Sequence, residues 1–424
     1  QHVEYDKNII RIDRGTGGWV VTSDNGDVYK SEKIVICSGS HQFKNDVSHK
    51  PKFKNFTGKI IHSSEYRFSS QEFHDKNIFV YGGGESSSDI AHELSSNAKK
   101  LYWEIPNGAW FINRISGNKN KYPTDYVNNR FVELVNPVSS KNKSLARSMH
   151  RALVNGAGIE EFRSASPHSR CFITKNTEVI RDIYLGRVVP IKGSGNFQGK
   201  TLNIDTKNNA DKKSVEIDTI VLCTGYMQKF PMLPTDKIKS TYDLYNLILN
   251  PDDTSIGFVG FARPIFGSIF GVAESQARYI SHVFSGSTRL DYSAMQRKII
   301  SDKKHYEKVF KYTSKRVDGL VEHAYYTDDL AKQTGHYPNF LKLFIQSPGK
   351  FFKAYFGPHH GCQYLLNDKR YHDLIYKKIY SRYSNIYSQV NPRFSFIPFF
   401  RDIVEGIFHK IRNTIIICIL RKDK

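Results

Sequence analysis

Cysteine is scarce in this sequence, and its spacing excludes the common cysteine-based sites. The 424 residues include five cysteines that stand far apart and form no CxxC pair. Free thiols in a reducing compartment are therefore expected, rather than a disulfide framework or a zinc site. No secretory signal follows Gln1. The chain does not begin with Met, which indicates a fragment.

Acidic residues are also few, because 41 Asp and Glu stand against 62 Lys and Arg, for a net charge of +21. Such a balance favours anionic partners, namely nucleotide phosphates, a phospholipid surface or nucleic acid. The cations are spread widely, and no zinc knuckle, RNP motif or helix-turn-helix pattern is present, so no nucleic-acid partner is predicted. His359 and His360 lack a third ligand at suitable spacing, so no metal site is predicted.

Long hydrophobic runs are missing too. The uncharged run 413–420 is far short of the roughly 20 residues of a spanning helix. Apolar residues from Ile403 to Ile415 nevertheless fall on one helical face, with Arg and Lys beside them. This pattern predicts an amphipathic tail over 391–424 that lies on a membrane surface. A helix docked on a soluble protein is the alternative.

The most informative stretch is a glycine-rich turn between an apolar run, 77–81, and a helical pattern that begins near Asp89. The turn reads GxGxxS, with Gly82, Gly84 and Ser87 at its key positions. Gly82 permits the sharp turn, Gly84 lets a pyrophosphate approach the backbone, and Ser87 lets the helix pack closely. The anion would bind at the helix N-terminus. An ordinary glycine-rich turn is the alternative.

Two further motifs flank this turn. Upstream, Phe56, Gly58, His62 and Tyr66 form the pattern FxGxxxHxxxY. Downstream, the apolar run 217–223 ends in the pattern TGYxxxFP, which contains Thr224 and Gly225. For the downstream motif a buried strand with a tight turn is the alternative, and for His62 of the upstream motif a hydrogen-bonded structural histidine is the alternative. The apolar run 33–37 is typical of a buried parallel strand.

Two segments nearer the C-terminus contain further motifs. Residues 256–280 predict a strand, a glycine turn at Gly267 and a helix that contains Gln276. Residues 357–364 read GPxxxxQY.

These markers, in this order, resemble the flavin-containing monooxygenases, including the dimethylaniline monooxygenases. The resemblance runs from about residue 17 to about residue 364. It implies an α/β fold with two Rossmann-like dinucleotide-binding domains, the cofactors FAD and NADP (with NAD as an alternative), and a set of cofactor-binding residues. Those residues are Gly82, Gly84, Ser87, Arg114, Thr224, Gly225, Gly267 and Gln276. Phe56, Gly58, His62 and Tyr66 would form the fingerprint linker, and no catalytic side chain is identified.

The resemblance also implies a domain plan. Residues 1–75 would be the first part of the FAD domain, 76–217 an inserted NAD(P)H domain with a helical insertion at about 115–170, and 218–390 the second part of the FAD domain. The family's first GxGxxG turn, which holds the FAD pyrophosphate, has no counterpart before Phe56. We therefore expect either a partial sequence of an active enzyme or a product that has lost flavin.

Nucleotide preference is left open by two residues. The family's arginine for the 2′-phosphate of NADPH falls near 106–107 and is missing here, whereas Arg114 remains. Glu104, near the end of the second strand, would accept a ribose hydroxyl and repel a 2′-phosphate.

The implied function is oxygenation of a soft nitrogen or sulfur atom of a small molecule, with NAD(P)H and O2, through a C4a-hydroperoxyflavin. Alternatives are a flavin-free NADP-binding protein without catalysis and a Baeyer–Villiger oxygenase, which Tyr66–Arg67 disfavours because that class usually carries Trp-Pro there. The absence of CxxxxC argues against a disulfide reductase. Relatives in animals are held on the endoplasmic reticulum by hydrophobic tails, so its cytosolic face is the expected location, with the cytoplasm as the alternative.

Overall fold

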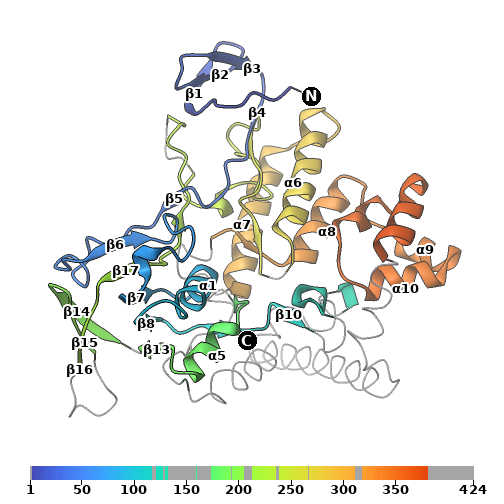
Figure 1. Cartoon of the computed structure of the whole chain (residues 1–424). Helices are drawn as coiled ribbons and strands as arrows, with labels where there is room; N and C mark the ends of the chain where they lie inside the picture. The colour runs from blue at the N-terminus through green and yellow to red at the C-terminus, as the bar shows by residue number, and fades with distance from the viewer. Residues whose placement is uncertain are drawn as a thin grey trace, which may run out of the picture. The chain divides into compact units, whose positions relative to one another are not determined.

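The computed structural model describes residues 2–116, 121–127, 129–131, 159, 173–191, 193–204, 213–234, 238–265, 267–310 and 318–380. The chain divides into two compact units (Figure 1). Unit 1 comprises Gln1–Arg114, Asn142–Ala262 and Arg289–Gly319, and unit 2 comprises Ile115–Lys141, Arg263–Thr288 and Leu320–Lys424. The helical insertion predicted at 115–170 lies largely outside the described residues, and the tail at 391–424 lies entirely outside them.

A five-stranded parallel sheet organises unit 1, with strand order β13–β8–β7–β17–β6. Its strands are β6 (Lys59–His62), β7 (Asn77–Tyr81), β8 (Lys100–Glu104), β13 (Val188–Ile191) and β17 (Thr219–Leu222). The central strands are nearly continuous apolar runs, because a parallel sheet is buried on both faces. This architecture confirms the predicted α/β class.

Two different layers cover the faces of this sheet. On one face lie α1 (Glu85–Leu94) and α5 (Glu178–Tyr184), which bury Leu94 and Ile180 against the strands. On the other face lies an antiparallel sheet of β14 (Ser194–Gln198), β15 (Thr201–Ile204) and β16 (Lys213–Glu216), which buries Phe197. Trp103 of β8 is fully buried, and its indole N–H donates to the carbonyl of Gly82 at 2.8 Å.

The remaining elements of unit 1 include those around a second core, which contains Trp19, Phe258 and Phe261. The remaining strands begin with an antiparallel meander of β1 (Ile9–Gly15), β2 (Gly18–Ser23) and β3 (Val28–Ser31). Three two-stranded pairs follow, namely β4 (Ile34–Ile36) with β19 (Ile256–Phe258), β5 (Phe43–Lys44) with β18 (Tyr226–Met227), and β9 (Trp110–Phe111) with β12 (Ile173–Thr174). The other elements are the 3₁₀ turns η1 (Gln71–Phe73) and η6 (Thr241–Asp243) and helix α7 (Tyr292–Phe310).

One prediction for this region is only half right. Strand β4 is parallel to β19, as the apolar run 33–37 predicts. It is not fully buried, however, because Val35 is exposed. Within the described part of the chain β4 pairs with β19 alone, so its other edge is not covered by a strand.

Unit 2 is mainly helical (Figure 1). Its elements are β10 (Ile115–Ser116), β11 (Tyr122–Pro123), η2 (Thr124–Val127), β20 (Arg263–Pro264), α6 (Ile269–Phe284), β21 (Leu320–Val321), α8 (His323–Gln333), α9 (Phe340–Gln346), α10 (Pro348–Phe356), η8 (Gly361–Leu365), η9 (Lys369–Tyr371) and the π-helical segment η10 (Leu374–Tyr380). Helices α6 and α8 pack together, as do α9 and α10. No helix in the described ranges is long and apolar enough to cross a membrane.

Candidate functional site

The carboxyl ends of three neighbouring strands meet at one edge of the parallel sheet. His62 of β6, Leu222 of β17 and Tyr81 of β7 are in register. The chain leaves β7 toward β8 on one side, whereas β17 lies on the other, so the strand order reverses at β7. Dinucleotides bind at the carboxyl edge of such a reversal. The predicted glycine turn, the His62 motif and the Thr224–Gly225 motif are therefore brought to one edge.

Gly82 makes the closest approach at this edge. Its φ is +135°, and a Cβ there would lie 2.2 Å from the carbonyl oxygen of Cys223. Any L side chain would collide with the backbone that follows β17, so glycine is required for the two strands to end side by side. The role predicted for Gly82, a sharp turn, describes its geometry.

Beyond Gly82 the turn opens into α1. Gly84 is the N-cap residue, no side-chain cap is found for this helix end among the described residues, and a Cβ on Gly84 would meet no atom within 4 Å. Ser87 is fully buried, and its hydroxyl donates to the carbonyl of Gly84 at 2.7 Å. Because the first backbone N–H groups of a helix lack intrahelical acceptors, this end presents open donors to an anion.

His62 ties two of the motifs together. Its Nε2 lies 3.1 Å from the carbonyl oxygen of Gly225, and its Nδ1 accepts from the backbone N–H of Ser64 at 3.1 Å. A carbonyl can only accept, so the ring carries its proton on Nε2. Burial lowers the pKa of His62, which favours this neutral form. In this structure His62 therefore links two chain segments through its hydrogen bonds.

The turn after β17 is held from a third segment. The hydroxyl of Thr224 donates to the carbonyl of Asn45 at 2.6 Å, and the N–H of Asn45 donates to the carbonyl of Gly225 at 2.9 Å. Gly225 has φ +79°, and a Cβ on it would meet no atom within 4 Å. The turn is thus fixed by its backbone while its outer side stays open.

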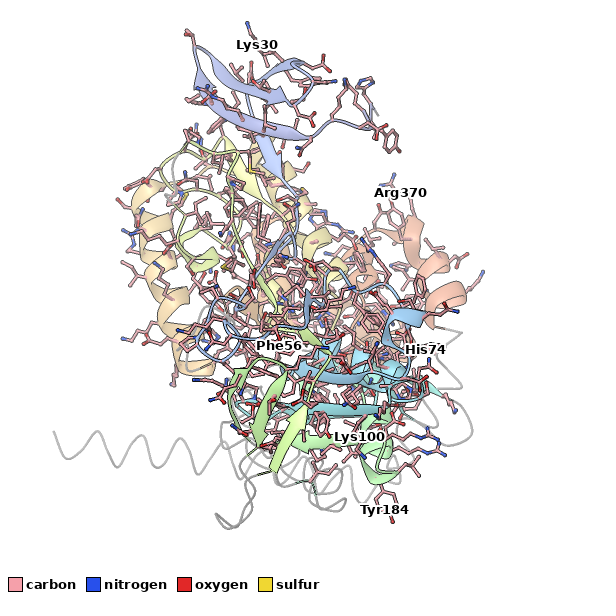
Figure 2. The ribbon with its side chains drawn as sticks, turned by 60° about the vertical axis from the view of Figure 1, so that its left-hand side comes forward. Lys30, Phe56, His74, Lys100, Tyr184 and Arg370 are labelled. Atoms are coloured by element: carbon pink, nitrogen blue, oxygen red, sulfur yellow. The ribbon has the colours of Figure 1, made fainter. Side chains whose placement is uncertain are left out.

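The other fingerprint residues pack rather than face a ligand. Phe56, labelled in Figure 2, has its ring 4.8 Å from that of Phe197. A Cβ on Gly58 would lie 2.4 Å from the ring of Phe56. The ring of Tyr66 lies 5.6 Å from that of Phe73, and burial, with Glu93 nearby, raises the pKa of Tyr66. These three residues therefore set the path of the chain around β6.

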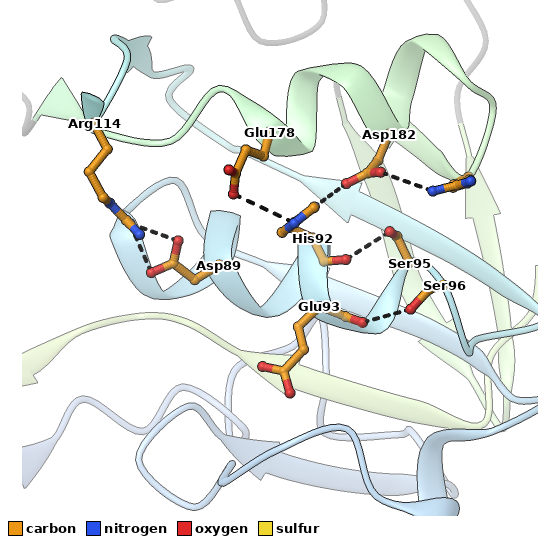
Figure 3. A pocket seen from close by; sticks show the side chains of 9 residues that line it. Asp89, His92, Glu93, Ser95, Ser96, Arg114, Glu178 and Asp182 are labelled. Atoms are coloured by element: carbon orange, nitrogen blue, oxygen red, sulfur yellow. Dashed lines mark hydrogen bonds and ion pairs between the residues drawn. The ribbon is translucent and has the colours of Figure 1, made fainter. Parts of the chain in front are cut away.

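Arg114 is engaged by carboxylates of α1 (Figure 3). Its Nη2 lies 2.9 Å and 3.1 Å from the two oxygens of Asp89 and 3.3 Å from Glu85. All three side chains are about half exposed, so the pairs are weak and exchangeable. A 2′-phosphate that uses Arg114 must compete with these acids, which the sequence reasoning missed.

A pocket of about 480 Å³ lies along the later turns of α1, beside α5. Figure 3 shows His92 between Glu178 and Asp182, with Nδ1 2.5 Å from Asp182 and Nε2 3.6 Å from Glu178. The pocket lining does not include the glycine turn. It is thus an acid-rich surface feature that shares Asp89 and Arg114 with the predicted nucleotide site but not the glycine turn.

The carboxylate of Glu104 already forms an ion pair and a hydrogen bond in the structure. Lys52 lies 3.0 Å from one carboxylate oxygen, the hydroxyl of Ser194 donates to that carboxylate, and both charged side chains are largely buried. The ribose role considered for Glu104 would require this pair to open. No local pattern reveals Lys52, because it lies 52 positions away in the chain.

Unit 2 holds the other two predicted cofactor residues. Gly267 has φ +108°, and a Cβ there would lie 3.0 Å from the ring of His323. The Nε2 of His323 is buried without a hydrogen-bond partner among the described residues, and it faces Gly271 at the start of α6. Gln276 is fully buried, and its amide donates to the hydroxyl of Tyr326 at 2.9 Å.

The GPxxxxQY segment encloses a buried arginine. Arg130 donates to Asp328 through Nη1 at 2.5 Å and 2.7 Å, and to Gln363 through Nε at 2.6 Å. Tyr364 donates to Asp328 at 2.7 Å. Gln363 and Tyr364 thus hold a neutralised ion pair in unit 2. Among the described residues, no group of three or more His, Cys, Asp and Glu is arranged to hold a metal ion.

The family model of the flavin-binding monooxygenase-like proteins matches residues 11–417. The chain belongs to this family. A 4-hydroxybenzoate brominase (decarboxylating) from Marinomonas mediterranea is 30% identical over 389 residues, covering 86% of this chain and 72% of the relative. Human flavin-containing monooxygenase 2 is 28% identical, with 86% and 70% covered.

Solved structures show the same fold. An open cyclohexanone monooxygenase matches with a TM-score of 0.55 at 13% identity, covering 77% of each chain. The S-allyl-L-cysteine S-oxygenase of Allium sativum matches with a TM-score of 0.50 at 20% identity, covering 82% of this chain and 67% of the other. The two-domain Rossmann-type class predicted from the sequence is thereby confirmed.

A flavin and a nicotinamide nucleotide, which this family implies, fit observations within each unit. In unit 1, Gly84 and Gly225 leave open space where a side chain would stand, and the N-terminus of α1 has no side-chain cap from the described part of the chain. In unit 2, an unpartnered buried nitrogen of His323 faces the start of α6. Individual cofactor contacts and the domain boundaries stay predictions. Strands β6 and β17 lie outside the range 76–217 that was predicted for the NAD(P)H domain, yet they belong to the same parallel sheet as β7, β8 and β13.

Replacing Gly82 should damage folding, whereas replacing Gly84 should not. Gly82→Ala places a methyl group 2.2 Å from the Cys223 carbonyl at φ +135°, and we expect a loss of about 2 to 5 kcal/mol in the free energy of unfolding. Gly84→Ala, at φ −105° with no neighbour within 4 Å, should lose less than about 1 kcal/mol. Denaturant unfolding followed by circular dichroism measures both. Equal losses would contradict this account of the turn.

Acid should destabilise unit 2 through His323. Burial, with Arg130 nearby, lowers the pKa of His323 from 6.5 to about 4. Because the unfolded chain binds the proton more readily, stability is full above pH 6.5 and falls as the pH drops toward 4. The loss from this group is up to about 3 kcal/mol. His323→Gln should flatten the dependence of unfolding free energy on pH, whereas His74→Gln, at an exposed position, should leave it unchanged.

Proposed function

We propose that this chain is a flavin-dependent monooxygenase that oxygenates a soft nucleophilic nitrogen or sulfur atom of a small molecule, with NADPH as reductant and NADH as the alternative. The observation that carries the proposal is the meeting of Gly82, His62 and Gly225 at the carboxyl edge where the strand order reverses. That edge is where a nicotinamide dinucleotide binds in this type of sheet.

Each residue of the edge has a distinct part in this proposal. The N–H groups that begin α1 bind the pyrophosphate, Gly84 leaves room for it, and Ser87 keeps the helix close to the sheet. His62 holds the turn at Gly225 through Nε2, and burial lowers its pKa and favours the neutral form, so its part in this proposal is to fix geometry. In unit 2, the flavin would lie near the start of α6, where the ring of His323 packs against Gly267 and Gly271.

A bound FAD would supply the redox chemistry, in which the hydride comes from the nicotinamide and one oxygen atom of O2 goes to the substrate. The balance is substrate, O2, NAD(P)H and a proton on one side, and oxygenated substrate, NAD(P)+ and water on the other. No protein nucleophile is required, since the substrate itself attacks oxygen. The chain's contribution is binding, orientation and exclusion of water.

A second candidate is oxygen transfer to bromide followed by bromination of a phenolic acid. The observation that favours it is the 30% identity to the 4-hydroxybenzoate brominase of Marinomonas mediterranea. Bromide, sulfides and tertiary amines are all soft nucleophiles, so the two candidates differ in the substrate rather than in how oxygen is activated.

Measuring NADPH oxidation and product formation with different substrates distinguishes these candidate functions. The purified full chain, supplied with FAD, should oxidise NADPH faster with a thioether or tertiary amine than with a ketone, and heavy-isotope-labelled O2 should label the product. Gly84→Val should weaken nucleotide binding, whereas Gly193→Val, also in open space, should not. A ketone preference would indicate a Baeyer–Villiger enzyme, and bromination of 4-hydroxybenzoate would indicate the second candidate. NADP binding without flavin binding would indicate a non-catalytic relative and overturn the proposal.

Asp89 should limit the preference for NADPH. Asp89→Asn removes the closest carboxylate from Arg114, and we expect the affinity for NADPH relative to NADH to rise about twofold to fivefold, as suits an exposed ion pair. Titration of intrinsic fluorescence or calorimetry measures both affinities. Glu93→Gln removes the same charge from α1 without touching Arg114 and is the matched control. A lower ratio in Asp89→Asn would mean that Arg114 is not the phosphate ligand.

The membrane contact predicted for the tail belongs to the same proposal. It rests on the amphipathic pattern at 391–424 and on the resemblance to animal relatives, and the location proposed for the enzyme is the cytosolic face of the endoplasmic reticulum. Fractionation of cells that express the full chain tests this location.

A further inference from the structure

Helices α9 and α10 form a pair with two dissimilar sides. They pack against one another, and Leu343 and Ala354 anchor them in the local core with Leu366 and Ile375. Their opposite sides carry large apolar side chains that are exposed among the described residues. We call these outward residues, Leu341, Phe344, Ile345 and Phe352, the α9–α10 surface. Figure 1 shows the helix pair.

The α9–α10 surface is continuous. Leu341, Phe344 and Ile345 are 71%, 43% and 72% exposed, and their spacing of three and four places them on one face of α9. Phe352 of α10 is 51% exposed, and its ring lies 6.3 Å from that of Phe344. Single exposed apolar residues are ordinary, whereas a contiguous group of this kind indicates an interaction site.

Along the chain, the charges in and next to the two helices are of one sign. No Asp or Glu occurs from Leu330 to Asn367, a stretch that includes both helices. Lys342 on α9 and Lys353 on α10 are exposed beside the apolar side chains. Apolar residues inserted among lysines bind anionic bilayers, because the side chains enter the acyl boundary while the ammonium groups meet lipid phosphates.

A second copy of the chain is a poorer occupant. A two-fold dimer would place the same patch against itself, so the lysines of each copy would face lysines and no acid. An anionic lipid surface has the complementary charge and accepts a convex apolar face. The helices have 7 and 9 residues, so they can lie on a bilayer but cannot span it.

We propose that the α9–α10 surface docks unit 2 on an anionic phospholipid bilayer, independently of the tail at 391–424 and of the oxygenase function. Phe344 and Ile345 enter the headgroup boundary, and the neighbouring lysines contact lipid phosphates. The two membrane contacts would then be separate in the chain and separable by mutation.

Vesicle sedimentation of the full chain tests the docking. Vesicles with phosphatidylserine should bind the protein, and neutral phosphatidylcholine vesicles should bind it more weakly. The double variant Phe344→Ser/Ile345→Ser should bind about tenfold less or weaker still. Ile300→Ser on α7, which removes a side chain that is 65% exposed, should bind like the original protein. Circular dichroism checks that each variant is folded.

Two results would overturn the proposal. One is unchanged vesicle binding in the double variant while Ile407→Ser/Phe408→Ser in the tail abolishes it. The other is a change of oligomeric state in the double variant without loss of vesicle binding, which would assign the surface to a second copy.

A conservative variant gives a direct readout of insertion. The chain has three tryptophans, Trp19, Trp103 and Trp110, and all are buried. Phe344→Trp adds one at the surface, and brominated phosphatidylserine vesicles should quench its emission. Leu185→Trp, at an exposed position of unit 1, is the control and should not be quenched. Absence of quenching at position 344 would contradict docking even if the serine variants failed to fold.

Discussion

The close approach of two backbones at the end of β7 is the constraint on which the rest of unit 1 depends. Because Gly82 has no side chain, the carbonyl of Cys223 can occupy the space where a Cβ would lie. Strands β7 and β17 can therefore end side by side. That level edge places the start of α1 beside the turn at Gly225, and it lets the ring of His62 reach the same turn from β6. A bulkier residue at position 82 would separate all three.

The supports of this edge come from several directions. The indole of Trp103 holds the Gly82 carbonyl from β8, and Asn45 holds Thr224 and Gly225 from a segment before β6. Lys52 and Glu104 join that earlier segment to the end of β8 through a largely buried ion pair. The open positions at Gly84 and Gly225 are therefore surrounded by fixed backbone, which is the arrangement that preorganised binding requires.

Local patterns predicted the parts of the site that depend on backbone conformation. The spacing of Gly82, Gly84 and Ser87 is enough to predict a strand, a turn and a helix, because each role concerns neighbours in the chain. The contact between His62 and Gly225 was not predicted, because it joins two motifs that lie 163 positions apart in the chain. The architecture itself is confirmed by relatives and by solved structures.

What sequence reasoning missed depends on side chains that meet across long separations. Arg114 was predicted to bind the cofactor because of the resemblance to the family, yet Asp89 and Glu85 already hold it. Glu104 was considered for a ribose, yet Lys52 neutralises it. Val35 was expected to be buried because an apolar run suits a central strand, whereas β4 has a single described strand partner. Periodicity carries no information about such pairings.

The burial of Trp103 has a spectroscopic consequence. All three tryptophans of the chain belong to unit 1, whereas unit 2 contributes helices α8, α9 and α10 and no indole. Intrinsic emission is thus a label confined to unit 1, while far-ultraviolet dichroism also senses the helices of unit 2. Coincidence of the two signals during denaturation reports whether the units unfold cooperatively or one after the other.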